Sequence, residues 1–449
     1  QESDVDECLT ALQRAALKDF DWIIVDHYGL DKTWQLRICE ALSTNQNYPP
    51  KVLVIDELAD RSHYADCLVD ASRLTPEGWD IYAPLVKTNC QLLLGPPYAP
   101  LDPLYPQLQP LTPPRHVLRR VLVFFGGVDQ SNQCSIALEA LSHPALAHLA
   151  LDVVLGQDAP HREEIRELVQ RRQNTFFHLG VPSLACLMLR ADLSIGSAGT
   201  VSWERAALGL PTIVAAVAEN QILGAKALAD AGAALWVDLL GAANPCKVLT
   251  QAVLSLKDEA NVLASLSYAA KALGDGRGLE RLCTAMLGPT SGRSLRPTLL
   301  EDEGLYYFWV NERDVRRQSF CSDVIPLKQH QCWFRNRLKL STAILRVLVD
   351  RNGYPLGQIR FELCKKKNTR AMISFSIDKV ARGYGIACEL VSLGLAELAK
   401  EWGPKTIAYG EVHSDNLESC RTFLRVGFLE GTPPHPGVRC FSRIAGRTI

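Results

Sequence analysis

Short runs of consecutive Val, Ile, Leu and Phe recur through the first half of the chain, and helical stretches separate them. A strand without alternation of polar and apolar residues is buried on both faces, which is the situation of parallel strands covered by helices. The regular alternation of such strands with helices predicts an α/β fold with parallel sheets. The runs occupy residues 21–26, 51–56, 121–125, 151–155, 175–178, 191–195 and 211–214.

A proline-rich segment, residues 96–114, divides these runs into two sets and holds eight prolines in nineteen residues. We interpret it as a linker, because proline does not fit inside a helix or a central strand. The sequence therefore predicts two doubly wound Rossmann-like domains. The first, over residues 1–105, is expected to be incomplete, and the second covers residues 115–285.

The pattern changes after about residue 297. Asn352 and Gly353 form a turn signal between two apolar runs, which predicts a β-hairpin. A strand over 371–377, a long helix from Gly385 to about Trp402 and a strand over 406–411 are expected to follow. Residues 297–449 are therefore predicted to form a separate α+β domain, and three domains suit a chain of 449 residues.

The composition excludes several classes of protein. Lys and Arg number 48 against 49 Asp and Glu, so no basic field indicates binding to nucleic acid. No apolar stretch reaches the length of a membrane span, and the charged first residues do not resemble a signal peptide, so we expect a cytoplasmic protein. The 14 cysteines include no CxxC pair; we expect no metal site and mostly buried thiols.

The third domain contains the most specific short motif, Arg382-Gly-Tyr-Gly-Ile-Ala387, between a predicted strand and a predicted helix. Gly383 and Gly385 allow the backbone to approach an anion closely, and the start of the helix offers amide donors. The motif thus indicates a diphosphate site. The alternative is an ordinary glycine turn that joins a strand to a helix.

Together with Asn416-Leu-Glu-Ser419 and the segment 423–428, this motif resembles the GNAT family of acetyl-CoA-dependent N-acetyltransferases over about residues 310–435. The resemblance implies that the loop amides bind the pyrophosphate of acetyl-CoA, and that the preceding strand pairs with its pantetheine arm. The cofactor-binding residues that it implies are Ile373, Phe375, Ile377, Arg382, Gly383, Tyr384, Gly385, Ile386, Ala387 and Asn416.

One position departs from the GNAT pattern. Phe423 stands where the family often has a tyrosine that acts as general acid, and a phenyl ring cannot donate a proton to a leaving thiolate. Glu411, at the end of the neighbouring strand, is the candidate catalytic base, with His413 as a second candidate. The alternative for both is a solvent-exposed strand end.

In the second domain, Gly126 and Gly127 follow a strand, and the segment 191–204 continues to Asn220-Gln221. These residues resemble the UDP-binding half of GT-B glycosyltransferases. The resemblance implies a diphosphate at residues 197–200 and ribose hydroxyls at Glu204; for Glu204 the alternative is a first-turn residue that complements the helix dipole. The UDP-sugar-binding residues that it implies are Gly126, Gly127, Val181, Ser197, Gly199, Thr200, Glu204 and Gln221.

The first domain contributes the strings 21–31, 54–61 and 93–98. With the second domain they resemble the PseG-like hydrolases of pseudaminic-acid biosynthesis, over roughly residues 1–285. That family releases UDP from UDP-2,4-diacetamido-2,4,6-trideoxy-β-L-altropyranose. The resemblance implies catalytic roles for Tyr28 and Asn220. Glu57 departs from the family, which usually has a second Asp there.

The family's G-x-G-H-x-x-R loop, whose histidine activates water, has no counterpart in this sequence. We expect that such a loop precedes Gln1, and we do not assign its role to His27, which belongs to a different motif. The main hypothesis is a UDP-sugar hydrolase fused to an acetyl-CoA-dependent N-acetyltransferase, with a UDP-linked amino sugar as substrate. The alternatives are a GT-B glycosyltransferase, or an inactive sugar-nucleotide module joined to an active acetyltransferase.

Overall fold

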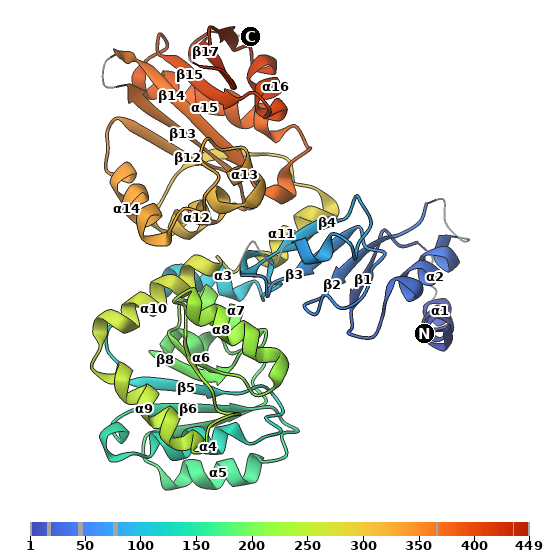
Figure 1. The fold of residues 1–449 in the computed structure, drawn as a ribbon, viewed down its shortest axis with the longest axis vertical. Helices are drawn as coiled ribbons and strands as arrows, with labels where there is room; N and C mark the ends of the chain where they lie inside the picture. The colour runs from blue at the N-terminus through green and yellow to red at the C-terminus, as the bar shows by residue number, and fades with distance from the viewer. Residues whose placement is uncertain are drawn as a thin grey trace. The chain divides into compact units, whose positions relative to one another are not determined.

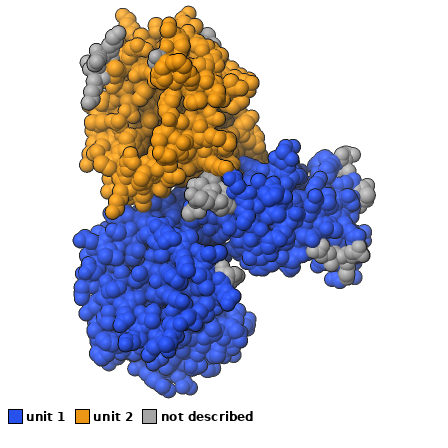
Figure 2. Space-filling model, viewed as in Figure 1, with its two compact units in different colours: residues 1–279 blue, residues 280–449 orange. Residues whose placement is uncertain are grey.

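The computed structural model describes residues 2–15, 19–43, 48–74, 80–364, 367–433 and 435–447. The chain divides into two compact units, residues 1–279 and residues 280–449 (Figure 2). Within the described residues, unit 1 contains two parallel sheets and unit 2 contains one mixed sheet (Figure 1). An α/β architecture with Rossmann-like sheets and a C-terminal α+β part is therefore confirmed.

The first sheet of unit 1 has four parallel strands that lie side by side in chain order. Two helices, α1 (Glu2–Arg14) and α2 (Lys32–Ser43), supply apolar residues to its core, including Val5, Trp34 and Ile38. The strands are β1 (Trp22–Asp26), β2 (Lys51–Ile55), β3 (Cys67–Asp70) and β4 (Gln91–Leu94).

The second sheet of unit 1 has the strand order β10-β9-β8-β5-β6-β7, and all its pairs are parallel. The chain moves outward from β5 to β7 and then returns to the other side of β5 to form β8. At such a reversal the loops after the two central strands diverge and open a crevice at their carboxyl ends. The strands are β5 (Arg120–Phe124), β6 (Ala150–Leu155), β7 (Thr175–Leu179), β8 (Leu193–Ser197), β9 (Thr212–Ala215) and β10 (Leu235–Val237).

Helices cover both faces of this sheet, as its continuous apolar strands require (Figure 1). Val121 and Val123 pack with α4 (Gln133–Leu141), α5 (Arg162–Arg171) and α9 (Pro245–Lys257). Leu122, between them, faces the opposite side. The helices on that side are α6 (Ala185–Arg190), α7 (Val201–Ala207), α8 (Ile222–Asp230) and α10 (Ala260–Leu273).

The proline-rich segment connects the two sheets of unit 1, and it is packed against the second of them. It forms η2 (Pro96–Tyr98), α3 (Leu104–Leu108) and η3 (Gln109–Leu111), and α3 contacts α6 and α7. Leu101 and Tyr105 are buried in the same apolar cluster as α7. A helix tolerates Pro106 because the residue lies in the first turn, where its missing N–H has no intrahelical partner.

Unit 2 contains a sheet with the order β11-β12-β13-β14-β15-β17-β16, in which only β14 and β15 pair in parallel within the described residues. Its strands are β11 (Ser294–Pro297), β12 (Ala343–Val349), β13 (Pro355–Cys364), β14 (Lys367–Ile377), β15 (Ile407–His413), β16 (Leu429–Gly431) and β17 (Val438–Ile444).

The two faces of this sheet carry different helices. Ile344 and Leu348 pack with α15 (Ile386–Trp402) and α16 (Leu417–Arg425) on one face. Leu345 and Val347, which alternate with them, pack on the other face with α12 (Glu303–Asn311) and α14 (Leu327–Leu338). The short helix α13 (Arg313–Arg317) follows α12 directly.

All fourteen cysteines are free, and only four of them are buried, so the expectation that most are buried was wrong. Among the described helices, none combines the length and the apolar character that crossing a membrane requires.

Arg115 fixes the ends of two helices of the second sheet from inside the protein. Its Nε donates to the carbonyl of Ala191 at 3.0 Å, its Nη1 to Leu208 at 2.7 Å and to Gly209 at 3.1 Å, and its Nη2 to Met188 at 3.0 Å. These carbonyls end α6 and α7. Burial lowers the pKa of Arg115 to about 10, so the guanidinium is still charged at neutral pH.

We predict that Arg115→Ala lowers the free energy of unfolding of the second sheet by about 3 kcal/mol or more, because it leaves buried carbonyls without donors. Hydrogen–deuterium exchange of peptides from α6 and α7 in increasing urea measures this change. Arg119→Ala, at an exposed side chain in the same segment, is the control and should change stability by less than about 0.5 kcal/mol. Equal protection in both variants would contradict the assigned role of Arg115.

Candidate functional sites

The carboxyl edge of the second sheet in unit 1 carries glycines of two kinds. Gly156 and Gly196 are required by packing, since a Cβ there would lie 2.5 Å from the carbonyl oxygen of Gly127 and 2.0 Å from that of Phe124. A Cβ at Gly127 or Gly199 would have no neighbour within 4 Å. Gly127 follows β5 and Gly199 follows β8, the two central strands. Each therefore leaves open space beside the main chain at the place where the strand order reverses.

Gly126 is required by its backbone, which has φ 105°, and it too has open space where a Cβ would lie. Ser197 ends β8 and is buried, and its carbonyl accepts a hydrogen bond from the buried guanidinium of Arg205. Thr200 is exposed at the start of α7. The structure thus brings together, at one sheet edge, the predicted diphosphate-contacting positions after β5 and after β8.

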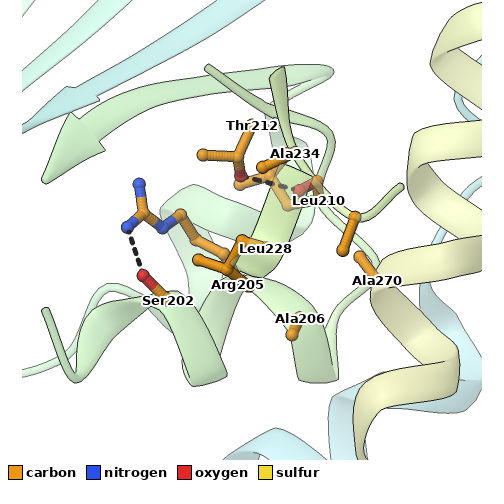
Figure 3. Close-up of a pocket in the computed structure, with 9 residues that line it drawn as sticks. Ser202, Arg205, Ala206, Leu210, Thr212, Leu228, Ala234 and Ala270 are labelled. Atoms are coloured by element: carbon orange, nitrogen blue, oxygen red, sulfur yellow. Dashed lines mark hydrogen bonds between the residues drawn. The ribbon is translucent and has the colours of Figure 1, made fainter. Parts of the chain in front are cut away.

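Beneath α7 lies a small cavity lined by Arg205, Thr212, Leu228 and their neighbours (Figure 3). Its volume is about 10 Å³, which is room for about one water molecule. Arg205 donates to Ser202 Oγ at 3.1 Å, and burial lowers its pKa to about 10. Arg205 therefore serves to hold the loop 197–202 and does not line a space that could hold a nucleotide.

Glu204 lies in the first turn of α7 with its carboxylate partly buried. The hydroxyl of Tyr105 donates to its Oε2. Val181 belongs to the same apolar cluster as Tyr105. Tyr105 therefore belongs to the apolar cluster of Val181 and is hydrogen-bonded to Glu204, and both of these residues are predicted UDP-sugar-binding positions.

Burial raises the pKa of Glu204, although the hydrogen bond from Tyr105 and the charge of Arg205 oppose the rise. Gln221 lies in η5 (Glu219–Gln221), and its Oε1 accepts from the main-chain N–H of Val217 at 3.2 Å, which shapes the loop after β9. Asn220 belongs to the same turn, but its side chain lies outside the described residues.

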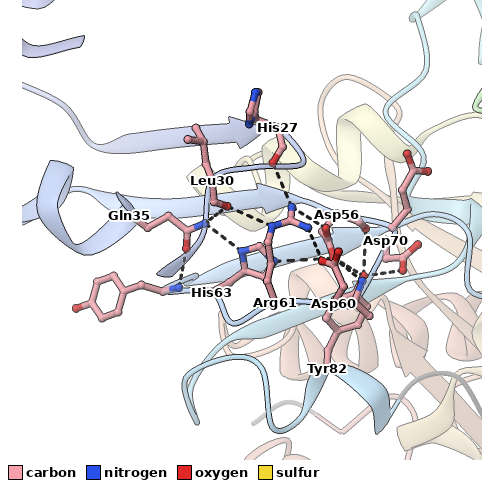
Figure 4. A network of polar contacts seen from close by, with 12 residues as sticks. His27, Leu30, Gln35, Asp56, Asp60, Arg61, His63, Asp70 and Tyr82 are labelled. Carbon is pink, nitrogen blue, oxygen red and sulfur yellow. Dashed lines mark hydrogen bonds and ion pairs between the residues drawn. The ribbon is translucent and has the colours of Figure 1, made fainter. Parts of the chain in front are cut away.

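At the carboxyl edge of the first sheet, two buried acids follow neighbouring strands. Asp56 comes directly after β2 and Asp70 ends β3. The hydroxyl of Tyr82 lies between them, 2.9 Å from Asp56 Oδ2 and 2.8 Å from Asp70 Oδ2 (Figure 4). Arg61 pairs with Asp56 at 2.9 Å, and Arg73 pairs with Asp70 at 2.6 Å.

This network holds the loop that carries Tyr28. Arg61 donates to the carbonyl of His27 at 3.1 Å and to that of Leu30 at 3.4 Å, on either side of Tyr28 (Figure 4). Arg73 donates to the carbonyl of Glu57 at 3.0 Å, and Tyr28 donates to Glu57 Oε1 at 2.5 Å. The hydrogen bond to Glu57, followed by burial, raises the pKa of Tyr28 to about 12.

Tyr28 therefore stays protonated at neutral pH, and the residue is 62% exposed. Its single O–H donates to Glu57, so it can donate to a ligand only if the ligand takes the place of Glu57 as acceptor. Glu57, noted above only as a departure from the family, is its acceptor. The sequence analysis did not assign Asp56, Arg61 or Asp70 to a site. For Asp56 the available signal was its place at the end of the apolar run 51–56, whereas Asp70 follows no run named in the sequence.

In unit 2 the parallel pairing of β14 with β15 stops part of the way along. The ladder ends at the pair Met372 and Tyr409, whereas β14 stays paired with β13 as far as Ile377. Residues 373–377 therefore present one row of main-chain groups to a wedge between the diverging strands. An extended ligand can add to such an edge by main-chain hydrogen bonds.

Phe423 fills the apolar core beside this wedge. It is buried, its ring is stacked on Phe441 at 5.3 Å, and Phe428 meets it edge-on at 4.7 Å. A Cβ at Gly410, on β15, would lie 2.7 Å from the Phe423 ring. The ring is thus part of the packing that shapes the wedge.

The loop after β14 has a buried half and an open half. Val380 and Ala381 are buried, whereas Gly383 and Gly385 are exposed with φ 87° and 75° and have no atom within 4 Å of a Cβ position. Tyr384 between them is 55% exposed. The helix α15 begins directly after this open half, so its first amides face the same space.

The remaining predicted residues of unit 2 have mixed environments. Ile386 is buried in the core, and Ala387 packs against it. Asn416 caps α16, since its Oδ1 accepts from the N–H of Ser419 at 3.1 Å. Glu411 is exposed and His413 is half-buried on the part of β15 beyond its pairing with β14. Across the described ranges, no three His, Cys, Asp or Glu side chains gather as metal ligands would.

Comparison with known proteins gives two matches to different parts of the chain. Residues 294–429 match the family described as an acetyltransferase (GNAT) domain. The spore coat polysaccharide biosynthesis protein SpsG of Bacillus subtilis (strain 168) is 28% identical over 203 residues, which are 45% of this chain and 59% of SpsG. The chain thus spans less than two thirds of that relative.

Among solved structures, the aminoglycoside acetyltransferase AAC(6')-Ib in complex with coenzyme A is 17% identical, with a TM-score of 0.31 over 34% of this chain and 95% of that chain. The spermidine N-acetyltransferase from Vibrio cholerae in complex with CoA and spermine is 15% identical, with a TM-score of 0.31 over 35% of this chain and 97% of that chain. From the matches to the family and to SpsG, we conclude that residues 294–429 are an acetyltransferase domain of the GNAT family, fused to a homologue of SpsG.

Proposed function

We propose that this chain acts twice on a UDP-linked amino sugar: unit 2 transfers an acetyl group from acetyl-CoA to an amine, and unit 1 releases UDP from the sugar. The substrate of unit 1 is UDP-2,4-diacetamido-2,4,6-trideoxy-β-L-altropyranose. The proposal for unit 1 depends most on one observation. Gly127 and Gly199 follow two different strands, and no neighbouring atom would clash with a Cβ at either position, so packing does not explain why both residues are glycine.

In unit 2 the amides of residues 383–387 and the start of α15 would bind the pyrophosphate of acetyl-CoA. The row of main-chain groups over 373–377 would pair with the pantetheine arm, which places the thioester in the wedge. The amine attacks the thioester carbonyl, the C–S bond breaks, and the amine loses a proton to Glu411 directly or through water. The proton that the thiolate takes up comes from a group other than Phe423.

In unit 1 the open backbone at Gly127 and Gly199 would receive the diphosphate, and Glu204 would accept hydrogen bonds from the ribose hydroxyls. Water attacks the anomeric carbon, the bond between that carbon and the UDP oxygen breaks, and UDP leaves with the electron pair. The proton that the water loses passes to solvent. Tyr28, whose pKa is raised, cannot be the base at neutral pH. If its O–H exchanges Glu57 for the ligand, Tyr28 can donate a hydrogen bond to the sugar or to the departing oxygen. Asn220 is the second catalytic residue of this site.

Two assays of the full chain test the proposal. With the diacetamido UDP-sugar alone, chromatography should detect free UDP. With acetyl-CoA and the corresponding 4-amino UDP-sugar, a thiol reagent should detect free CoA. UDP release only in the presence of a sugar acceptor would make unit 1 a transferase, and binding without release would make it a sugar-nucleotide-binding module.

We predict that Gly385→Val lowers the affinity for acetyl-CoA by about 100-fold, because a branched side chain is strained at φ 75° and fills the space beside the loop amides. Isothermal titration calorimetry with acetyl-CoA measures the change. Gly403→Val is the matched control: Gly403, at the other end of α15, also has a positive φ, 93°, and open space. An equal loss in both variants would remove the pyrophosphate assignment.

We predict that Glu204→Ala weakens UDP binding by about 1 to 3 kcal/mol through the loss of charge-assisted hydrogen bonds. Because burial raises the pKa of Glu204, UDP affinity in the parent chain should fall on acidification at a higher pH than for an ordinary glutamate. Calorimetry across pH 4 to 8 measures both effects. Glu167→Ala, at an exposed glutamate on α5, removes the same charge and should change neither. If Glu204→Ala bound UDP with the same pH dependence as the parent chain, the ribose role of Glu204 would be contradicted.

We predict that Tyr28→Phe lowers kcat for UDP release by about 100-fold, since it removes the hydroxyl that would donate to the reacting sugar nucleotide. Tyr48→Phe is the control, because Tyr48 is 56% exposed and its hydroxyl also donates to a carboxylate, that of Asp21, at 3.3 Å. Steady-state rates of UDP release from the diacetamido UDP-sugar compare the two. Matching rates would exclude Tyr28 from the chemistry.

A further inference from the structure

The corner between α12 and α13 holds both ends of the buried half of the loop after β14. At the first end, Trp309 Nε1 donates to Asp378 Oδ2 at 2.9 Å, and Asp378 is fully buried. At the other end, Arg382 Nη2 donates to Glu312 Oε2 at 2.6 Å. Residues 378–382 are thus attached to α12 at both ends, whereas Gly383 and Gly385 have open space around them.

Glu312 has two tasks, one for each carboxylate oxygen. Its Oε1 accepts from the N–H of Asp314 at 3.1 Å and so caps α13, and its Oε2 receives Arg382. Glu312 is only 6% exposed. A carboxylate at this depth needs a partner of opposite charge, because an unpaired buried charge is strongly unfavourable. The position of Glu312 therefore constrains where the Arg382 side chain can lie.

Arg382 is committed to this position by a second bond. Its Nε donates to the carbonyl of Ile377, the last residue of β14, at 3.1 Å. Its remaining terminal nitrogen lies 3.6 Å from Asp314 Oδ2, a more exposed and more distant partner. The guanidinium thus folds back over the buried half of the loop. In the open half, residues 383–387, main-chain amides are the groups that would bind the anion.

We propose that Glu312 is a positioning residue for acetyl-CoA: by holding Arg382, it fixes the loop so that the amides of residues 383–387 are arranged before the pyrophosphate arrives. The inference rests on the acetyl-CoA site proposed above. A loop that is ordered in the free protein loses less conformational freedom on binding, which increases affinity without a direct contact to the ligand. Glu312 should therefore affect binding of the cofactor and leave the acetyl-transfer step unchanged.

The test is Glu312→Gln in the full chain, because glutamine keeps an oxygen that can cap α13 but loses the ion pair with Arg382. We expect the KM and the dissociation constant for acetyl-CoA to rise about tenfold, with kcat at saturation within about twofold of the parent. Arg382→Gln, which changes the more exposed partner, should give a similar loss. The double variant should lose no more than either single variant, as for two residues acting through one bond.

Asp314→Asn is the matched control, since Asp314 is the other acidic neighbour of Arg382, and it should leave acetyl-CoA affinity within about twofold. The role of Glu312 would be overturned if Glu312→Gln bound acetyl-CoA as tightly as the parent chain or more tightly. It would also be overturned if the losses of the two single variants added up in the double variant. If Glu312→Gln unfolds, Arg382→Gln alone decides the question by the same measurements. If Gly385→Val keeps its affinity for acetyl-CoA, the cofactor site itself is wrong, which is a separate outcome.

Discussion

Both candidate sites depend on main chain that has no strand or side chain beside it. In a parallel sheet the central strands end at one edge, and reversal of strand order lets the loops after β5 and β8 part there. In unit 2, the ladder between β14 and β15 ends while β14 continues. Each arrangement leaves backbone donors facing open space, and glycine keeps that space open. Gly383 and Gly385 have φ of 87° and 75°, which glycine adopts readily and residues with a Cβ do not.

Buried charged side chains keep these edges in place. Arg115 bonds to four carbonyls at the ends of α6 and α7, and Arg205 holds the carbonyl at the end of β8. Arg61 does the same for the loop that carries Tyr28. An arginine can bind several carbonyls in one plane with its fixed fork of donors, so it suits the joining of loops that no regular ladder connects.

The parts of the fold that depend on local pattern were predictable. Every apolar run named at the outset became a strand, because a run of Val, Ile and Leu has few other stable environments. The glycine motif 382–387 joins a strand and a helix as expected. β3 was missed, since its four residues Cys67–Asp70 are too short to give a periodic signal. The packing of the proline-rich segment was not predicted, because it depends on contacts of Leu101 and Tyr105 with helices much later in the chain.

The residue pairs that shape the sites could not be predicted either, because their members lie far apart in the sequence. Tyr105 and Glu204 are 99 positions apart, and Glu312 and Arg382 are 70 positions apart, so no local spacing relates them. The sequence did single out glycines that have open space beside them in the structure, such as Gly127, Gly199, Gly383 and Gly385. It gave no signal for the residues that hold them, which are ordinary in type and become specific only through the fold.

The proposed activities would explain why two such sites occur on one chain. If unit 2 adds an acetyl group to the same UDP-linked sugar from which unit 1 releases UDP, one step supplies the substrate of the other. In that case a covalent connection would fix the two proposed activities at a ratio of one to one, and it would limit how far the first product has to diffuse. Because each unit has its own core and its own open main-chain edge, either step can change its substrate without rebuilding the other.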